Sequence, residues 1–122
     1  MKLKISSVAD KGTLKDERII IKATTDADVG DFVLFQTGFN KDTSEVTTHV
    51  YHAYWFPWKK ISAGDLVVVY TKSGTGSEKK LKERGTAHFF YWGLPSPIWN
   101  TTERAPVLLY TAEWESKGPQ EL

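Results

Sequence analysis

The sequence predicts an all-β protein, a single immunoglobulin-like β-sandwich of about seven strands. Short apolar or alternating runs recur at roughly even spacing along the 122 residues, separated by Gly, Pro, Asp and Asn. No stretch of ten or more residues shows the 3.6-residue periodicity of an amphipathic helix. The run Leu66–Tyr70 is unbroken, apolar and β-branched, and it follows the turn Ala63-Gly64-Asp65. Such a run is typical of a central strand that is buried on both faces.

The strands are expected in the following order. The first, Leu3–Val8, alternates polar and apolar residues, which predicts a half-buried edge strand. Further strands are predicted at Glu17–Ala23, Phe32–Thr37, Val46–Trp55, Leu66–Tyr70, Ala87–Trp92 and Val107–Trp114, with a short segment Ile98–Trp99 before the last one. Pro57 ends the fourth strand because proline cannot donate a hydrogen bond to a β-ladder. Residues 115–122 are expected to form a frayed tail.

Period-2 alternation divides the fourth strand into two faces. His52, Tyr54 and Phe56 share one face, and Ala53 and Trp55 share the other. His49 and His52 are three residues apart, so their imidazoles are expected on opposite faces and cannot chelate one metal ion.

Composition narrows the function classes. The length fits one domain, residues 1–122. The absence of cysteine excludes disulfides, thiolate metal sites and a cysteine nucleophile. Sixteen basic against fifteen acidic residues leave a charge of +1, which argues against nucleic acid as the partner. No signal-peptide h-region and no membrane span are visible, so a cytoplasmic location without membrane attachment is the default expectation.

The sequence contains no catalytic motif. A Gly-x-Ser-x-Gly nucleophile elbow is absent, and no carboxylate stands isolated in an apolar run where its pKa would rise. We therefore expect a protein that is not an enzyme and that uses no metal and no cofactor.

The segment Ser73–Gly85 is the only long polar insertion. Glycines near both ends and charges between them predict an exposed, mobile loop, with a short helical turn at Glu78–Arg84. Its basic residues include Lys79, Lys80, Lys82 and Arg84. Together with Lys59 and Lys60 they form either a patch for an acidic partner or a nucleic-acid backbone, or a solvated loop, and the last interpretation is favoured.

Two aromatic clusters, Tyr54–Trp58 and Phe89–Trp92, are the most informative feature for function. Consecutive rings on a strand point to opposite faces, so one ring of each pair must point outward unless something covers it. The candidate contact residues are Tyr54, Trp55, Trp58, Tyr91, Trp92 and Trp99. They indicate an interface for a protein partner or a second copy, or alternatively a carbohydrate-binding surface. A core filled with bulky rings explains the clusters equally well.

The order of the motifs resembles a known family. Glu17-x-Ile-x-Ile is followed by Gly30-Asp-Phe-x-Leu, by Ala63-Gly-Asp leading into a valine run, and by Ile98-Trp-Asn before Pro106-Val-Leu-Leu-Tyr. This order resembles the lamin-tail domain, an immunoglobulin-like β-sandwich also found in bacterial proteins, over roughly Leu3 to Trp114. The resemblance implies a non-enzymatic module used for attachment to other machinery.

Overall fold

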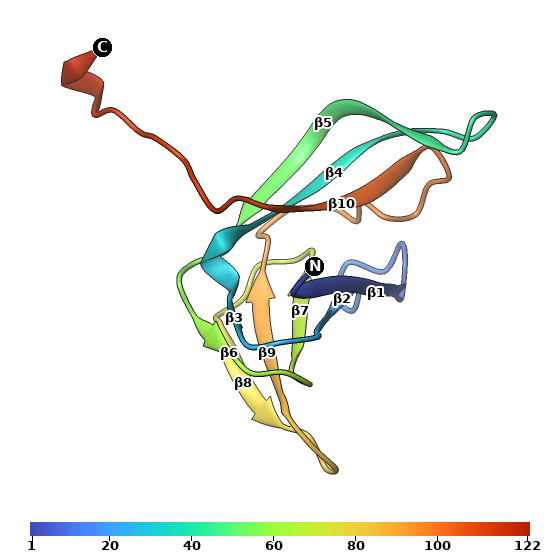
Figure 1. The fold of residues 1–122 in the computed structure, drawn as a ribbon. Coiled ribbons are helices and arrows are strands. Elements are labelled where there is room, and N and C mark those ends of the chain that lie inside the picture. Colours follow the sequence, from blue (N-terminus) through green and yellow to red (C-terminus); the bar gives the residue numbers. More distant parts are fainter.

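Two β-sheets face each other across a shared core in the computed structural model, which describes residues 1–122 (Figure 1). One sheet has five strands in the order β1-β2-β7-β9-β8, and the other has three in the order β10-β4-β5. The five-stranded sheet consists of β1 (Leu3–Ala9), β2 (Arg18–Ala23), β7 (Leu66–Tyr70), β9 (Thr86–Tyr91) and β8 (Ser77–Lys80). The three-stranded sheet consists of β4 (Phe32–Asn40), β5 (Glu45–Trp55) and β10 (Arg104–Tyr110). The predicted all-β sandwich is confirmed.

Short elements complete the chain. β3 (Ala27–Asp28) pairs with β6 (Lys60–Ile61) in a two-stranded ladder, and the 3₁₀ turn η1 (Val29–Asp31) follows β3 directly. A second 3₁₀ turn, η2 (Pro119–Glu121), lies in the tail, which leaves the sandwich after β10 (Figure 1). No helix in the structure has the length and apolar content needed to cross a membrane.

The central strand is β7, as predicted. It pairs antiparallel with β2 and parallel with β9. Val67, Val68 and Val69 are all buried. A parallel neighbour requires a crossover connection. Here β8 is part of that connection. It runs antiparallel to β7 and β9, and β9 then lies between β7 and β8 in the sheet.

The core is formed by alternate residues of both sheets. The five-stranded sheet directs aliphatic side chains inward from β2 and β7, together with Phe90 of β9. Phe56, which follows β5, packs edge-to-face on Phe90 with ring centroids 5.3 Å apart, so the two sheets meet through an aromatic pair. The other core members include Leu3, Ile19, Ile21, Phe32, Leu34, Val67, Val69, Ile98 and Trp99.

A buried carboxylate connects four segments of the fold. Glu17 is fully buried, and its oxygens accept hydrogen bonds from the backbone N–H groups of Gly12 (3.0 Å), Ile98 (2.9 Å) and Trp99 (3.1 Å) and from the Thr71 hydroxyl (2.5 Å). Burial alone would raise the pKa of Glu17, but these four donors outweigh burial and leave the pKa below its ordinary value of 4.5. The Ile98–Trp99 segment therefore forms no strand. It is held by the carboxylate instead.

The segment Ser73–Gly85 corrects one prediction. Ser77–Lys80 is not part of a free loop or a helical turn but forms the edge strand β8, paired antiparallel with β9. The following turn is closed by a hydrogen bond from Leu81 N–H to the Gly85 carbonyl (3.0 Å). The sequence lacks a strand signal here because an edge strand depends on backbone pairing, and charged side chains are tolerated on it.

The predicted ends and faces of two other strands also need correction. The last strand is Arg104–Tyr110 rather than Val107–Trp114, since Thr111 leaves the sheet. In β5 the alternation is correct from His52 to Phe56, where Tyr54 is half-buried, Phe56 is buried and Trp55 is exposed. Nearer the hairpin turn the ladder is interrupted by register shifts, and Thr48 adopts a positive φ of 65°. Strict alternation fails there because bulges change which face each residue occupies.

Candidate binding surface

The η1 turn organises the most exposed aromatic residues of the protein. Asp28 caps the turn: its Oδ1 accepts a hydrogen bond from the Gly30 N–H (2.9 Å). The same oxygen accepts a second bond from the Lys59 N–H (2.9 Å), which lies 31 positions further along the chain. One carboxylate thus connects the turn to the segment that carries Trp58.

Trp58 lies against Gly30. A Cβ atom added to Gly30 would come well inside 3.0 Å of the Trp58 indole, so only glycine allows the ring to approach this backbone. Trp58 nevertheless remains 62% exposed. The turn therefore supports one side of the indole while the rest stays open to solvent.

Trp55 is held by the same residue. Its indole Nε1–H donates to the Gly30 carbonyl (3.0 Å), which satisfies the only polar atom of the side chain. The ring is still 50% exposed. Gly30 thus positions two tryptophans, one through van der Waals contact and one through a hydrogen bond.

The tail contributes a third tryptophan. The Thr111 N–H and hydroxyl both donate to the carbonyl of Asp31, the last residue of η1 (2.7 and 3.0 Å). Three residues later Trp114 packs edge-to-face on Trp55, with ring centroids 4.9 Å apart and an angle of 90° between the planes. Trp114 is 51% exposed. We name Trp55, Trp58 and Trp114 the tryptophan surface.

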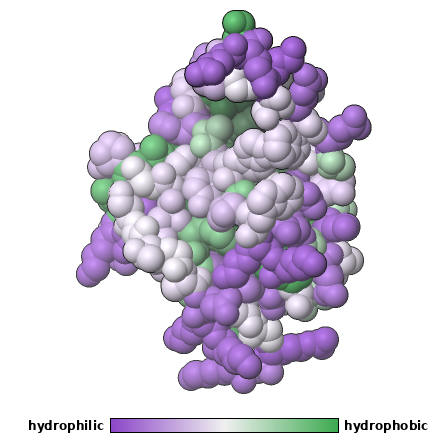
Figure 2. All heavy atoms as spheres, turned by 90° about the vertical axis from the view of Figure 1, so that its left-hand side faces the viewer, coloured by the Kyte–Doolittle hydropathy of each residue, from purple (hydrophilic) through white to green (hydrophobic).

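A groove runs along this surface. It has a volume of about 290 Å³ and is lined by the tryptophan surface together with Phe56 and Pro57. Monomeric proteins seldom expose large contiguous apolar patches, and such patches often mark interaction sites. Figure 2 looks onto the side of the molecule on which β6 and β8 lie in Figure 1. A pale band of near-neutral residues crosses this side between strongly hydrophilic regions (Figure 2).

A second cavity lies on the other side of Trp58. It has a volume of about 420 Å³, and its walls come from the end of β5 and the segment 57–59, from the β7–β8 connection, from β8 and from β9. We name it the Glu78 cavity. Glu78 and Lys59 meet there in an ion pair (3.0 Å), and this ammonium group holds the pKa of the Glu78 carboxyl below its ordinary value. A flat aromatic ring therefore stands beside paired hydrogen-bonding groups.

Behind Glu78 lies a buried histidine. His88 Nε2 is 2.8 Å from Asp65 Oδ2, and Nδ1 is 3.3 Å from Glu78 Oε2. Burial would raise the pKa of Asp65, but hydrogen bonds from the Ser62 N–H, His88 and the Thr86 N–H leave it lowered. His88 Nε2 thus forms a hydrogen bond with Asp65, whereas Nδ1 is buried and lies near Glu78 without a hydrogen bond. No group of three or more His, Asp or Glu side chains has the geometry of a metal site.

The predicted contact residues fall into three groups. Trp55 and Trp58 belong to the tryptophan surface, while Tyr54 and Tyr91 line the Glu78 cavity. Trp99 was wrongly placed among the contacts: it is 4% exposed and belongs to the core. Trp92 is half-buried and packs against that core, with its ring centroid 6.3 Å from that of Trp99.

Local sequence patterns did not reveal three residues that form or support this surface, Trp114, Gly30 and Asp28. Trp114 was assigned to a final strand, although its neighbours Glu113 and Glu115 mark it as an aromatic residue in a polar segment. Gly30 enters the sequence analysis only through the motif Gly30-Asp-Phe-x-Leu, and Asp28 lies just before that motif. Their role depends on residues far along the chain, and no local pattern reveals it.

The basic residues of the segment Ser73–Gly85 form no compact site. Lys79 and Lys80 lie on β8, and Lys82 and Arg84 lie in the following turn. All four side chains are exposed, and none forms an ion pair within the chain.

Comparison with protein-family models, with curated proteins and with solved structures finds no match for this chain.

Proposed function

We propose that this chain is a non-catalytic interaction module that binds a partner protein through the tryptophan surface. The observation that supports it is the η1 turn, which holds three half-exposed indoles in fixed positions with backbone and threonine hydrogen bonds. Tryptophan is the residue most enriched among binding hot spots, where each one contributes roughly 2 kcal/mol or more. Rings that are ordered before binding lose little entropy when the partner arrives.

The proposal includes the resemblance to the lamin-tail domain. Two of the motifs that carry it, Glu17-x-Ile-x-Ile and Ile98-Trp-Asn, are joined by hydrogen bonds in the structure. A third, Gly30-Asp, is the turn that supports the tryptophan surface. These contacts give the motif order a physical reason, and a module of this kind serves for attachment rather than for chemistry.

The test compares the tryptophan variant with a control at another exposed aromatic residue. Wild type, Trp58→Ala/Trp114→Ala and Tyr51→Ala are immobilised, incubated with lysate of the source cells, and the captured proteins are identified by mass spectrometry. Tyr51 is 45% exposed and lies away from the groove, so its variant is the control. We expect a saturable partner that wild type and the control retain and the tryptophan variant loses. Light scattering on the same samples shows whether that partner is a second copy.

An identical set of captured proteins for all three samples would contradict the proposal.

The Glu78 cavity favours a second candidate, the binding of a carbohydrate. A sugar site needs a carboxylate or amide beside an aromatic ring, and Glu78 and Lys59 stand beside Trp58. Cello-, xylo- and chito-oligosaccharides titrated into the protein, with tryptophan fluorescence as the signal, test this function. Binding that Glu78→Gln removes and Trp114→Ala leaves unchanged would assign the cavity to a sugar. No response to any of the three oligosaccharides would rule out these glycans as ligands.

A further inference from the structure

The charges of this nearly neutral chain are divided between its two halves. Residues 1–24 and 64–92, which build the five-stranded sheet, contain 11 Lys and Arg against six Asp and Glu, a net charge of +5. The remaining residues contain five Lys and Arg against nine Asp and Glu, a net charge of −4. Two of the six acidic side chains in the basic half, Glu17 and Asp65, are buried and do not reach the surface.

The strand register concentrates the positive charge on one face. Ile19, Ile21, Val67, Val69 and Phe90 point into the core, so the alternate residues of β2, β7 and β9 point outward. The pairing then aligns outward residues in rows across the sheet. One row runs Lys4, Lys22, Leu66, Ala87, Lys79, and the next runs Ser7, Ile20, Val68, Phe89, Ser77. No acidic residue occupies either row.

Lys4 and Lys22 are a cross-strand pair of like charge. They are directly paired in the register, and both are exposed. Like charges in this position destabilise a sheet. None of the ion pairs in the structure neutralises either lysine. An anionic ligand would remove this repulsion, which nothing in the fold itself compensates.

Aromatic residues lie in the next outward row of the sheet, which contains Arg18, Tyr70 and Tyr91. Tyr70 and Tyr91 stack with ring centroids 5.2 Å apart and planes at 10°. The guanidinium of Arg18 lies 5.8 Å and the ammonium of Lys72 lies 5.0 Å from the centroid of the Tyr70 ring. The face therefore has an apolar and aromatic centre, formed by the partly exposed Ile20, Phe89, Tyr70 and Tyr91, between cationic margins.

We propose that the outer face of the five-stranded sheet binds single-stranded nucleic acid. Phosphates lie along the lysine row and at Lys72, and unpaired bases cover the apolar centre between them. Arg18 is already paired with Asp10 (2.8 Å) and is left out of the phosphate track. Single-strand-binding surfaces combine these same two components, a cationic track and aromatic or apolar contacts for the bases. A duplex keeps its bases paired and could use only the margins. The net charge of the whole chain, +1, argued against nucleic acid because the positive charge of one half and the negative charge of the other cancel in the sum.

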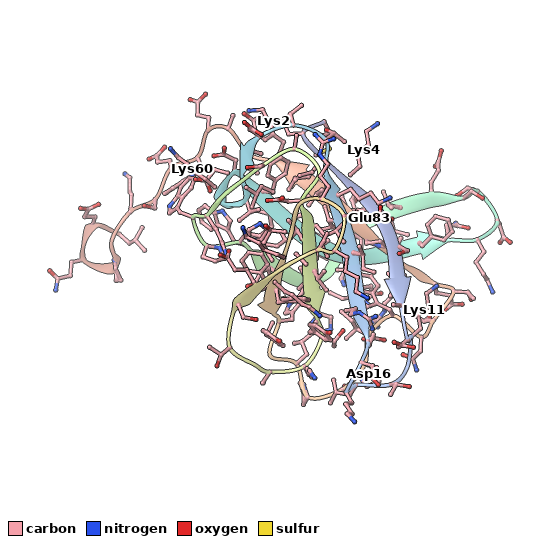
Figure 3. All side chains as sticks on the ribbon, turned by 90° about the horizontal axis from the view of Figure 1, so that it is seen from below. Lys2, Lys4, Lys11, Asp16, Lys60 and Glu83 are labelled. Atoms are coloured by element: carbon pink, nitrogen blue, oxygen red, sulfur yellow. The ribbon has the colours of Figure 1, made fainter.

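The test uses the full chain and a fluorescein-labelled oligothymidylate of about 20 nucleotides, followed by anisotropy at several salt concentrations. The variant Lys4→Gln/Lys22→Gln/Lys79→Gln removes three charges from the face. The control Lys41→Gln/Lys60→Gln/Lys117→Gln removes three exposed lysines from outside it. In the view from below, Lys60 lies on the other side of the molecule from Lys4 and Lys11 (Figure 3). Thermal melts check that both variants stay folded.

Wild type and control are expected to bind alike, and the face variant about tenfold or more weakly at low salt. A plot of log K against log salt has a negative slope, and each lost phosphate contact reduces its magnitude by about 0.7. The three substitutions therefore reduce the magnitude by about 2. An abasic oligomer of the same length should bind more weakly than oligothymidylate, because it has the phosphates but not the bases.

Three outcomes would overturn the proposal. One is no saturable binding at low salt, and another is an equal loss in face variant and control. The third is equal binding of the abasic oligomer, a heparin fragment or phosphatidylserine vesicles, which would reduce the face to a general surface for anions.

Discussion

The indole of Trp58 rests on Gly30, at a distance that leaves no room for a side chain on the turn. The same glycine accepts the indole hydrogen bond of Trp55 (3.0 Å). One small residue in a three-residue 3₁₀ turn thus determines the position of two of the three exposed tryptophans. The arrangement of the tryptophan surface therefore depends on the η1 turn as well as on the rings.

Gly30→Ala is expected to displace the Trp58 ring while the sandwich stays folded. The added methyl overlaps the indole and also approaches the Trp58 Cα, so we expect a loss of about 1–3 kcal/mol in unfolding free energy. Acrylamide quenching of tryptophan fluorescence should increase. Gly118→Ala is the control, because nothing lies within 4 Å of a Cβ at that position. Equal quenching in both variants would show that Gly30 does not hold the ring.

Glu17→Gln is expected to destabilise the protein by about 3 kcal/mol, measured by urea unfolding. A glutamine has one acceptor oxygen where the carboxylate has two, so its amide N–H₂ must face backbone donors. The exposed Glu45→Gln, in the β4–β5 hairpin, should change stability by less than about 0.5 kcal/mol. A small loss for Glu17→Gln would mean that water replaces the missing acceptor.

Acid is expected to destabilise the protein through Glu17 and Asp65. The pKa of each carboxyl is lowered in the folded state, so the stability it contributes is present above its unfolded pKa, ordinarily 4.5 and 3.8. That contribution is lost as the pH falls through the folded-state values, so stability should decline below about pH 5. Urea unfolding between neutral pH and pH 3 measures the decline. Glu17→Gln should show a shallower one, and an unchanged slope would contradict the role of Glu17.

His88→Leu is expected to loosen the edge strand β8. The substitution removes the imidazole that stands between Asp65 and Glu78, and it leaves the Asp65 carboxylate buried with fewer donors. We expect a loss of about 2 kcal/mol and faster amide hydrogen exchange in β8. His49→Leu, at an exposed position of β5, is the control. Protection of the β8 amides that is equal in both variants would show that the imidazole does not hold the strand.

Local patterns were sufficient for most of the strands. The apolar run Leu66–Tyr70 predicted the buried central strand, and the alternation from His52 to Phe56 predicted that Trp55 and Phe56 lie on opposite faces, as they do. These predictions succeed because a strand has a period of two and its burial follows from its own side chains. The strand β8 could not be predicted in this way, because it depends on the ladder to β9 and not on an apolar pattern of its own.

The sequence by itself determined the all-β class, the central strand and the two clusters of consecutive aromatic rings. Only the tertiary structure decided which rings are exposed. The backbone N–H of Trp99 donates to the Glu17 carboxylate, 82 positions away, and the Trp99 ring lies in the core. Trp114, in the tail, packs on Trp55 instead. The tertiary structure also decided that Lys4, Lys22 and Lys79, which are far apart in the sequence, lie in one row across the outer face of the five-stranded sheet. The physical reason is the same in each case. Hydrogen bonds and strand register join residues that are distant in the chain, and no local period records these partners.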